Sequence, residues 1–279
     1  MNDLIHAIKM SINAHTHLPF AVYSSLKEQR IFNVPIIKPV LIVVLDGEKR
    51  LGKDADVICT AGSFIFLSNN PMLDMRNIPS EREYFALLIE FEQQDFAVFN
   101  SRPKTTQKYL VGTIEKSLQT LLQQFIEWSA FAPPALWPIR RAEILQYLDF
   151  LGYHPVRGMA GDTRLSQKLH DLVRANLAED LSSAEICAQL AMSESTLRRK
   201  LQAEGTSVQD IKDQTKLGYG LHLLQTSAES IGAIAELCGY QSQSRFSERF
   251  KQRFGLTPSE LRKTKLHESG ENLAVLERT

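Results

Sequence analysis

Two short basic segments in the second half of the chain carry side chains suited to nucleic-acid recognition. The first, SESTLRRKLQ, begins at Ser193, and the second, QSRFSERFKQRF, begins at Gln243. Guanidinium groups recognise guanine edges and phosphates, while amides and hydroxyls hydrogen-bond to bases or to the DNA backbone. The candidate DNA-contacting residues are Ser195, Thr196, Arg198 and Arg199 in the first segment, and Gln243, Ser244, Arg245 and Arg249 in the second.

Each basic segment lies on a predicted amphipathic helix whose inner face is apolar. Apolar residues recur at a spacing of four, namely Leu197 and Leu201 in the first segment, and Phe246, Phe250 and Phe254 in the second. Residues at this spacing share one face of a helix, so the basic residues fall on the other faces. We therefore expect reading helices at about 194–204 and 243–254.

A short apolar helix and a tight turn precede each of these predicted helices. Ser193 is suited to cap the first reading helix, and Gly239 fits the turn before the second because glycine adopts a left-handed backbone. A predicted long helix, Val208–Leu224, joins the two units. Two helix-turn-helix units in this arrangement can place helices in successive major grooves of one DNA face. For one isolated helix, a charged face exposed to solvent is the simpler interpretation. The presence of a second helix-turn-helix unit favours DNA binding instead.

The first half of the chain predicts a small antiparallel barrel or sandwich. Short apolar runs alternate with turn signals between about residues 20 and 91, and Pro39–Leu45 followed by Asp46-Gly47 is the clearest example. Two helical patterns follow between about 105 and 151, at 108–131 and 136–151. We expect this helical hairpin to cover one side of the barrel or to form a homodimer through its outer face, and both roles can hold.

Domain boundaries follow from these patterns and from a segment rich in glycine and proline, GYHPVRGMAGD, which begins at Gly152. The fold class is α+β. We expect an effector-binding or dimerisation domain at 1–155, a linker at 156–163, a DNA-binding domain of helices at 164–265 and a tail at 266–279.

Composition excludes several classes of protein. The chain has 32 basic and 32 acidic residues, so charge that attracts DNA must be local. The three cysteines, Cys59, Cys187 and Cys238, lie far apart without a CxxC motif, which indicates neither a zinc site nor a disulfide framework. The segment MNDLIHAIKM lacks the pattern of a signal peptide, and the longest apolar run is too short to cross a bilayer. We expect a cytoplasmic protein without a membrane partner.

The region from Arg164 onwards resembles the DNA-binding domain of the AraC/XylS family of bacterial transcription regulators. The residues that carry the resemblance are Ile234-Ala235 through Gly239-Tyr240, Phe246, Phe250-Lys251, Phe254-Gly255, Thr257-Pro258 and Arg262. The resemblance implies a seven-helix domain that reads adjacent major grooves. It also implies a cupin-like barrel that holds a small effector, followed by helices that dimerise. The string IAELCGYQS is similar to the ToxT-like branch of virulence regulators.

One residue departs from the pattern of that family. Glu248 stands where family members often carry a basic or neutral contact residue. A carboxylate repels phosphate but can accept a hydrogen bond from cytosine N4. We expect Glu248 to point away from the DNA, and the alternative is that it reads a base.

The similarity to the ToxT-like branch implies an apolar anionic effector such as a fatty acid. Candidate partners for its carboxylate are Lys27, Arg30 and Lys38 on the barrel and Lys216 on the long helix. A basic side chain on a half-buried strand costs free energy unless it is paired. The alternative is that each extends its charge into solvent.

No metal or cofactor is expected. The chain has one His-x-His motif, His15-Thr16-His17, which precedes the strands. The downstream Glu and His of metal-binding cupins do not follow it at the family spacing.

The sequence therefore predicts a transcription regulator that is not an enzyme. We expect an activator that binds double-stranded promoter DNA, works with RNA polymerase, and is controlled by a small ligand or by dimerisation. One alternative is a regulator whose N-terminal domain binds a protein partner and no small molecule. The other is a metal-dependent cupin enzyme fused to a DNA-binding module.

Overall fold

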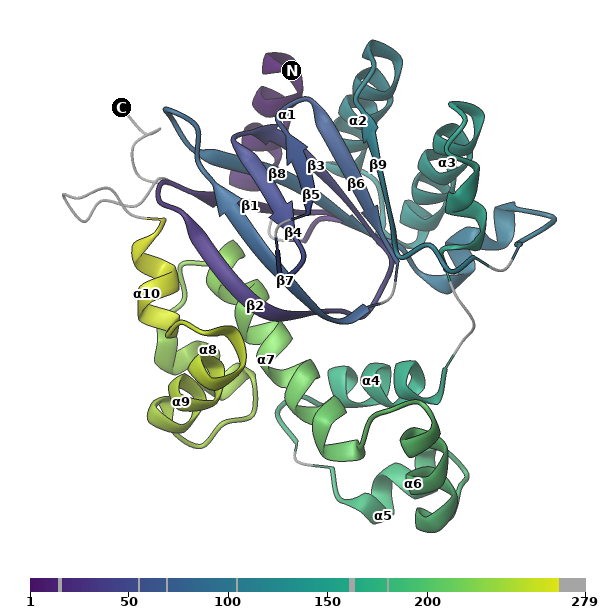
Figure 1. Cartoon of the computed structure of the whole chain (residues 1–279), viewed down its shortest axis with the longest axis vertical. Helices are drawn as coiled ribbons and strands as arrows, with labels where there is room; N and C mark the ends of the chain where they lie inside the picture. Colours follow the sequence, from purple (N-terminus) through teal and green to yellow (C-terminus); the bar gives the residue numbers. More distant parts are fainter. Residues whose placement is uncertain are drawn as a thin grey trace.

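The computed structural model describes residues 1–14, 17–54, 56–68, 70–103, 105–160, 164–179 and 181–265. Two β-sheets with helices on one side lie above an entirely helical region (Figure 1), so the predicted α+β class is confirmed. His15 and Thr16, residues 161–163 of the predicted linker and the predicted tail at 266–279 lie outside the described residues. Within the described parts of the chain, no helix is both long enough and apolar enough to traverse a bilayer.

The strands form two sheets, which together make up the barrel, and every strand pairing within them is antiparallel. The first has the order β1 (Ala21–Ser25), β8 (Tyr84–Glu90), β3 (Val40–Asp46), β6 (Ser63–Leu67) and β9 (Tyr109–Thr113). The second has the order β2 (Gln29–Ile36), β7 (Asn70–Ile78), β4 (Glu48–Leu51) and β5 (Val57–Thr60).

Strand β3 is buried on both faces, which explains its unbroken run of apolar residues. Leu41 and Val43 belong to a core shared with the N-terminal helices, whereas Ile42 and Val44 face the core between the sheets. Alternate residues of a strand point to opposite faces, so one strand serves both cores.

Three helices cover the outer face of the five-stranded sheet, namely α1 (Asn2–Ala14), α2 (Lys116–Ser129) and α3 (Trp137–Phe150). Three 3-10 turns accompany them, η1 (Gln93–Val98), η2 (Pro134–Leu136) and η3 (His154–Gly158). Sequence reasoning assigned no element to the segment that forms α1, although Leu4 and Ile8 are spaced by four residues and are buried.

The prediction of helix from about residue 105 is wrong at its beginning. Residues Tyr109–Thr113 form β9, and the helix begins at Lys116. Leu110 and Ile114 match a helical spacing, but β6 has an open edge whose hydrogen bonds the segment completes, with Leu110 opposite Phe66. A strand partner distant in sequence decided the conformation here.

The predicted linker at 156–163 is partly packed against the barrel. Val156, Met159 and Ala160 are buried in the core that the barrel shares with α1, α2 and α3. Residues 161–163, which complete the predicted linker, are those outside the described residues.

Among the described residues from 164 to 265, the chain forms seven α-helices. They are α4 (Leu165–Ala175), α5 (Ser183–Gln189), α6 (Glu194–Ala203), α7 (Val208–Thr226), α8 (Ile231–Leu237), α9 (Gln243–Phe254) and α10 (Pro258–Lys263). Thr257 caps α10 in a capping box with Glu260, and Pro258 occupies the first turn.

The two helix-turn-helix units are packed differently. The first has a core of its own, in which Leu169, Ile186, Leu197, Leu201 and Ile211 meet. The phenylalanine stripe of α9 belongs instead to the core that continues between the two sheets. The second unit is therefore fixed to the barrel, while the first extends away from it (Figure 1).

Candidate nucleic-acid interface

Helix α6 presents its basic residues to solvent as the sequence predicts. Leu197 and Leu201 are buried, whereas Ser195, Arg198 and Arg199 are exposed. The residues Glu194, Ser195, Arg198, Arg199 and Gln202 line one shallow hollow on this surface. Sequence reasoning did not select Glu194 or Gln202 as site residues, although both lie on the outer faces that the helical spacing predicts.

Thr196, which is predicted to contact DNA, also forms hydrogen bonds with Ser193. The Ser193 hydroxyl accepts a hydrogen bond from the Thr196 backbone N–H at 3.3 Å and donates one to the Thr196 hydroxyl at 2.9 Å. Ser193 is therefore the N-cap of α6, as predicted. The half-buried hydroxyl of Thr196 is part of this cap, which leaves Ser195 as the more exposed hydroxyl of the first turn.

A carboxylate fixes the far end of α6 to α4. Glu204 accepts hydrogen bonds from the backbone N–H groups of Leu165 and Ser166 at 2.9 and 3.0 Å. Burial opposes ionisation of Glu204, but these bonds outweigh it and hold the pKa of Glu204 below its usual value. The contact satisfies two free N–H groups at the N-terminus of α4 and sets the position of the first reading helix.

Helix α9 buries Phe246, Phe250 and Phe254, and it leaves Gln243, Ser244 and Arg245 exposed. The Ser242 hydroxyl caps the helix by accepting from the Arg245 backbone N–H at 3.3 Å. Glu248 is exposed on this helix. Gly239 and Gly255 both have a positive φ, of 73° and 82°, as the predicted turn and helix end require.

Arg249 differs from Arg245 because it is held within the protein. Its guanidinium forms an ion pair with Asp213 of α7 and donates a hydrogen bond to Gln252 at 3.1 Å. Sequence reasoning placed Arg249 on the outer face of α9 but did not identify Asp213, which lies 36 positions away in the chain.

Helix α7 separates the two reading helices. Its 19 residues give a length of about 28 Å, which is close to one turn of B-DNA at about 34 Å. The α5–α6 unit lies beside one end of α7 and the α8–α9 unit beside the other (Figure 1). Two helices held in this way can in principle enter neighbouring major grooves.

The four candidate effector-binding residues lie in separate surroundings. Lys27 is exposed in the turn between β1 and β2, where its backbone N–H donates to the Thr264 carbonyl at 3.1 Å. Arg30 is exposed on β2 and lies over the Phe32 ring at 5.2 Å from its centroid. Lys216 is half-buried on α7, against the turn that contains Gly239.

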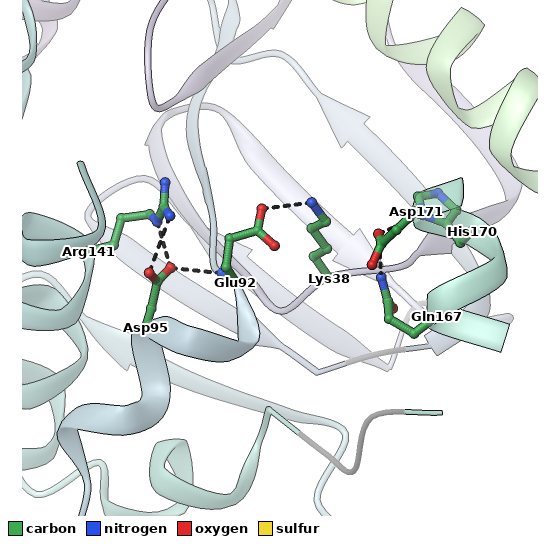
Figure 2. Close-up of polar contacts among 7 residues, drawn as sticks. All are labelled: Lys38, Glu92, Asp95, Arg141, Gln167, His170 and Asp171. Carbon is green, nitrogen blue, oxygen red and sulfur yellow. Dashed lines mark hydrogen bonds and ion pairs between the residues drawn. The ribbon is translucent and has the colours of Figure 1, made fainter. Parts of the chain in front are cut away.

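Lys38 lies between the barrel and α4. Its ammonium forms an ion pair with Glu92 at 2.7 Å, and on its other side are Gln167, His170 and Asp171 of α4 (Figure 2). Burial of Asp171 opposes ionisation, but the His170 hydrogen bond and the charge of Lys38 keep the pKa of Asp171 low. Lys38 is thus a half-buried base at the junction of the barrel and the helical region.

The partner of Lys38 is connected to the N-terminal helices. The Glu92 backbone N–H donates to Asp95 at 2.8 Å, and Asp95 accepts from Arg141 of α3 at 2.6 and 3.2 Å (Figure 2). Asp95 and Arg141 are both buried. A buried, doubly hydrogen-bonded guanidinium–carboxylate pair holds its element firmly, so the position of Glu92 beside Lys38 is well defined.

A second set of polar residues, most of them buried, joins β2 of the barrel to α7 and to the residue that follows α10. Gln29 of β2 accepts hydrogen bonds from Asn77 and Gln225, both at 2.9 Å, and donates one to Thr264 at 2.8 Å. Asn77 in turn accepts from the buried ammonium of Lys49 at 2.7 Å. Sequence reasoning did not find this set, because its members are single polar residues within strands and helices far apart in the chain.

Among the described residues, no three His, Cys, Asp or Glu side chains are grouped so that they could hold a metal ion. Two of the three residues of the His15-Thr16-His17 motif lie outside the described residues.

The helical region matches known regulators. Residues 169–264 match a family model described as a helix-turn-helix domain. The transcriptional regulator SirC of Salmonella typhimurium (strain SL1344) is 34% identical over 101 residues, which cover 36% of this chain and 34% of SirC. The match to SirC thus spans about a third of that protein's length. GadX of Escherichia coli (strain K12), an HTH-type transcriptional regulator, is 24% identical over 243 residues, which cover 79% of this chain and 81% of GadX.

Most of the chain also resembles a solved structure. The crystal structure of ToxT from Vibrio cholerae, with an unsaturated fatty acid bound, superposes with a TM-score of 0.64 at 17% identity, covering 90% of this chain and 96% of ToxT. This similarity extends over the barrel as well as the helices, and it shows a common fold. The region at 169–264 is thus similar to the helix-turn-helix domains of transcription regulators such as SirC and GadX, and the chain has a ToxT-like fold.

Proposed function

We propose that this protein is a transcription activator that binds promoter DNA through α6 and α9 and recruits RNA polymerase. The observation that supports this most directly is the placement of two capped, basic helices beside opposite ends of α7, whose length is close to one turn of DNA. The proposed contacts are Ser195, Thr196, Arg198 and Arg199 in α6, and Gln243, Ser244, Arg245 and Arg249 in α9.

The test is a selection of duplexes from a random-sequence pool by the full-length protein, followed by binding measurements on the enriched duplex. We expect affinity to fall steeply with salt, because each phosphate contact releases counterions. Arg198→Ala and Arg245→Ala should each weaken binding and relax base preference at one position, by about 1–3 kcal/mol. Arg82→Ala is the control, since it removes an exposed arginine from the loop whose Glu83 pairs with Lys9 of α1, remote from the reading helices. Failure of the wild-type protein to enrich any sequence would refute the proposed function.

We further propose that the barrel controls DNA binding by holding a small apolar anion such as a fatty acid. The crystallised ToxT that shares this fold has an unsaturated fatty acid bound. Lys38 is the best placed of the four candidate bases, because it is half-buried beside both Glu92 and α4. A carboxylate at Lys38 would compete with Glu92 and would act on the contact between the barrel and α4.

Thermal shifts and native mass spectrometry with a panel of fatty acids test ligand control. We expect binding by the wild-type protein and weaker binding by Lys38→Met, with Lys53→Met as an exposed control on the barrel. Lys27, Arg30 and Lys216 are tested by the same substitution. If no lipid binds and a protein partner copurifies instead, control by a partner is the better explanation. Tightly bound metal in the purified protein would favour the cupin-enzyme alternative.

A further inference from the structure

An ion pair between Arg249 and Asp213 joins the second reading helix to α7 at its surface. Arg249 Nη2 bonds to Asp213 Oδ2, and Arg249 Nη1 donates to Gln252 at 3.1 Å. The other oxygen of Asp213 accepts from Gln209 at 3.1 Å. The guanidinium is therefore held on two sides, by a residue of α7 and by a residue of its own helix.

Asp213 is placed to act on two arginines of α9. Its charge acts on Arg253 as well as on Arg249, and burial lowers the pKa of Arg253 while the carboxylates of Asp213 and Asp210 oppose that shift. One carboxylate of α7 thus faces two guanidinium groups of α9. These contacts lie on the side of α9 that borders α7, whereas Arg245 makes no hydrogen bond or ion pair with a described side chain except through its backbone.

Arg249 retains donors that can meet a ligand. Each Nη carries two N–H groups and uses one of them in the contacts above, and the Arg249 side chain remains 41% exposed, against 22% for Asp213. A free arginine loses rotamer freedom when it binds, and an arginine that is already oriented loses less. The Arg249 side chain is thus held by its contacts and still partly exposed, and guanine O6 and N7 are acceptors that a guanidinium recognises.

We propose that Asp213 is a positioning residue for DNA reading, which orients Arg249 toward a guanine. The inference rests on the proposed DNA-binding function and deepens it at one base position. It differs from sequestration, in which Asp213 would simply withhold Arg249 from the DNA. In the positioning role, removal of the carboxylate weakens discrimination, whereas in sequestration it strengthens binding to all DNA.

The experiment uses the full-length protein, the duplex that the wild-type protein enriches from a random pool, and a scrambled duplex of equal length. Asp213→Asn should lower the affinity ratio of selected to scrambled duplex on the order of tenfold. The lost preference should fall at the base position that Arg249→Ala also relaxes. The double variant should be no worse than Arg249→Ala alone, because Asp213 acts through Arg249.

Two further variants separate positioning from general destabilisation. Arg249→Lys keeps the charge and can keep an ion pair with Asp213, but it lacks the planar fork, so base preference should weaken while the melting temperature is retained. Asp213→Glu should restore part of the preference. Glu236→Gln is the charge-matched control, because it removes an exposed carboxylate from the neighbouring α8.

The outcomes are distinct. If the wild-type protein enriches no sequence, the proposed function itself fails. If it does enrich one, but Asp213→Asn leaves the ratio unchanged or tightens binding to both duplexes, DNA binding stands and the positioning role is overturned. Loss of stability in Asp213→Asn with base preference intact would also overturn it.

Discussion

The hydroxyl of Tyr23 on β1 lies 3.3 Å from Nδ1 of His222 on α7, so a strand of the barrel and the helix between the two reading units meet at a half-buried polar contact. Glu90 of β8, Arg174 of α4 and Tyr219 of α7 surround the same point. Arg174 lies over the Tyr219 ring at 3.5 Å from its centroid. Four elements from both halves of the chain therefore converge on His222.

This contact should make stability fall at mildly acidic pH. Burial lowers the pKa of His222, and the charge of Arg174 adds to this effect while Glu90 opposes it. As pH falls below about 6.5, the unfolded chain takes up a proton at His222 that the folded chain does not, so the free energy of unfolding decreases. We expect His222→Gln to show a smaller drop in melting temperature between about pH 7.5 and about pH 5.5. The exposed His6→Gln is the control, and equal pH profiles for both variants would contradict the prediction.

Lys49 should make stability rise at alkaline pH. Burial lowers the pKa of its ammonium to about 8, and its hydrogen-bond partners, Asn77 and Tyr84, are neutral. Between that value and about 10.4 the unfolded chain holds a proton that the folded chain has released, so the free energy of unfolding increases with pH. Lys49→Met removes this pH-dependent gain in the free energy of unfolding. The variant's free energy of unfolding, measured with denaturant, should therefore fall relative to that of the wild type by up to ~3 kcal/mol as the pH rises over this range. Exposed Lys53→Met should run parallel to the wild type.

Gly255 should be required for the contact between the second helix-turn-helix unit and the barrel. Its φ is +82°, and a Cβ would lie 2.4 Å from the Phe32 ring of β2. Gly205, at the end of α6, has a φ of +75° with no neighbour within 4 Å of such a Cβ. Both alanine variants carry backbone strain of roughly 1 kcal/mol, but only Gly255→Ala adds a clash of roughly 1–3 kcal/mol.

Denaturant unfolding of the two alanine variants measures that difference. In a Phe32→Ala background the excess cost at Gly255 should disappear, because the ring that causes it is gone. Equal destabilisation by Gly205→Ala and Gly255→Ala would show that the contact with the Phe32 ring adds nothing to the cost of Gly255→Ala.

The outer surface of α3 should form a homodimer. Phe150 is 79% exposed and Ile139 is 64% exposed, and Phe131 before α3 is exposed as well. Large apolar side chains gathered on one surface indicate a protein interface. We expect the wild-type protein to be a dimer by light scattering, and Ile139→Glu with Phe150→Glu to be a monomer. Ile58→Glu on β5 is the control for added charge at an exposed apolar residue. A monomeric wild type would show this prediction to be wrong.

Residues with local signals were predicted well. The four-residue spacing of Phe246, Phe250 and Phe254 specifies one buried face, and Ser193 caps α6 as expected. The bounds of both reading helices follow from these signals almost to the residue, because caps, helical spacing and glycine turns act over a few neighbours.

The sequence does not predict the conformation of residues whose partners lie far away in the chain. Tyr109–Thr113 became a strand because the edge of β6 was available, and α1 is held by the apolar face of the five-stranded sheet. The four candidate effector-binding bases share a charge, but the structure places Lys38 between the barrel and α4, Lys216 half-buried on α7, and Lys27 and Arg30 at exposed positions. Burial and pairing depend on which elements meet in space, and chain spacing carries no information about that.

The sequence by itself determined the helices, the caps and the repeated basic faces, and thereby the similarity of 169–264 to DNA-binding helix-turn-helix domains. Only the tertiary structure decided that α9 shares its core with the barrel while α6 does not, and that Asp213 holds Arg249 while Arg245 stays exposed. The physical reason is the separation along the chain between the residues that interact. Helix formation is governed by interactions three or four residues apart, whereas coupling between the barrel and a reading helix depends on contacts such as Gln29 with Gln225, which only packing brings together.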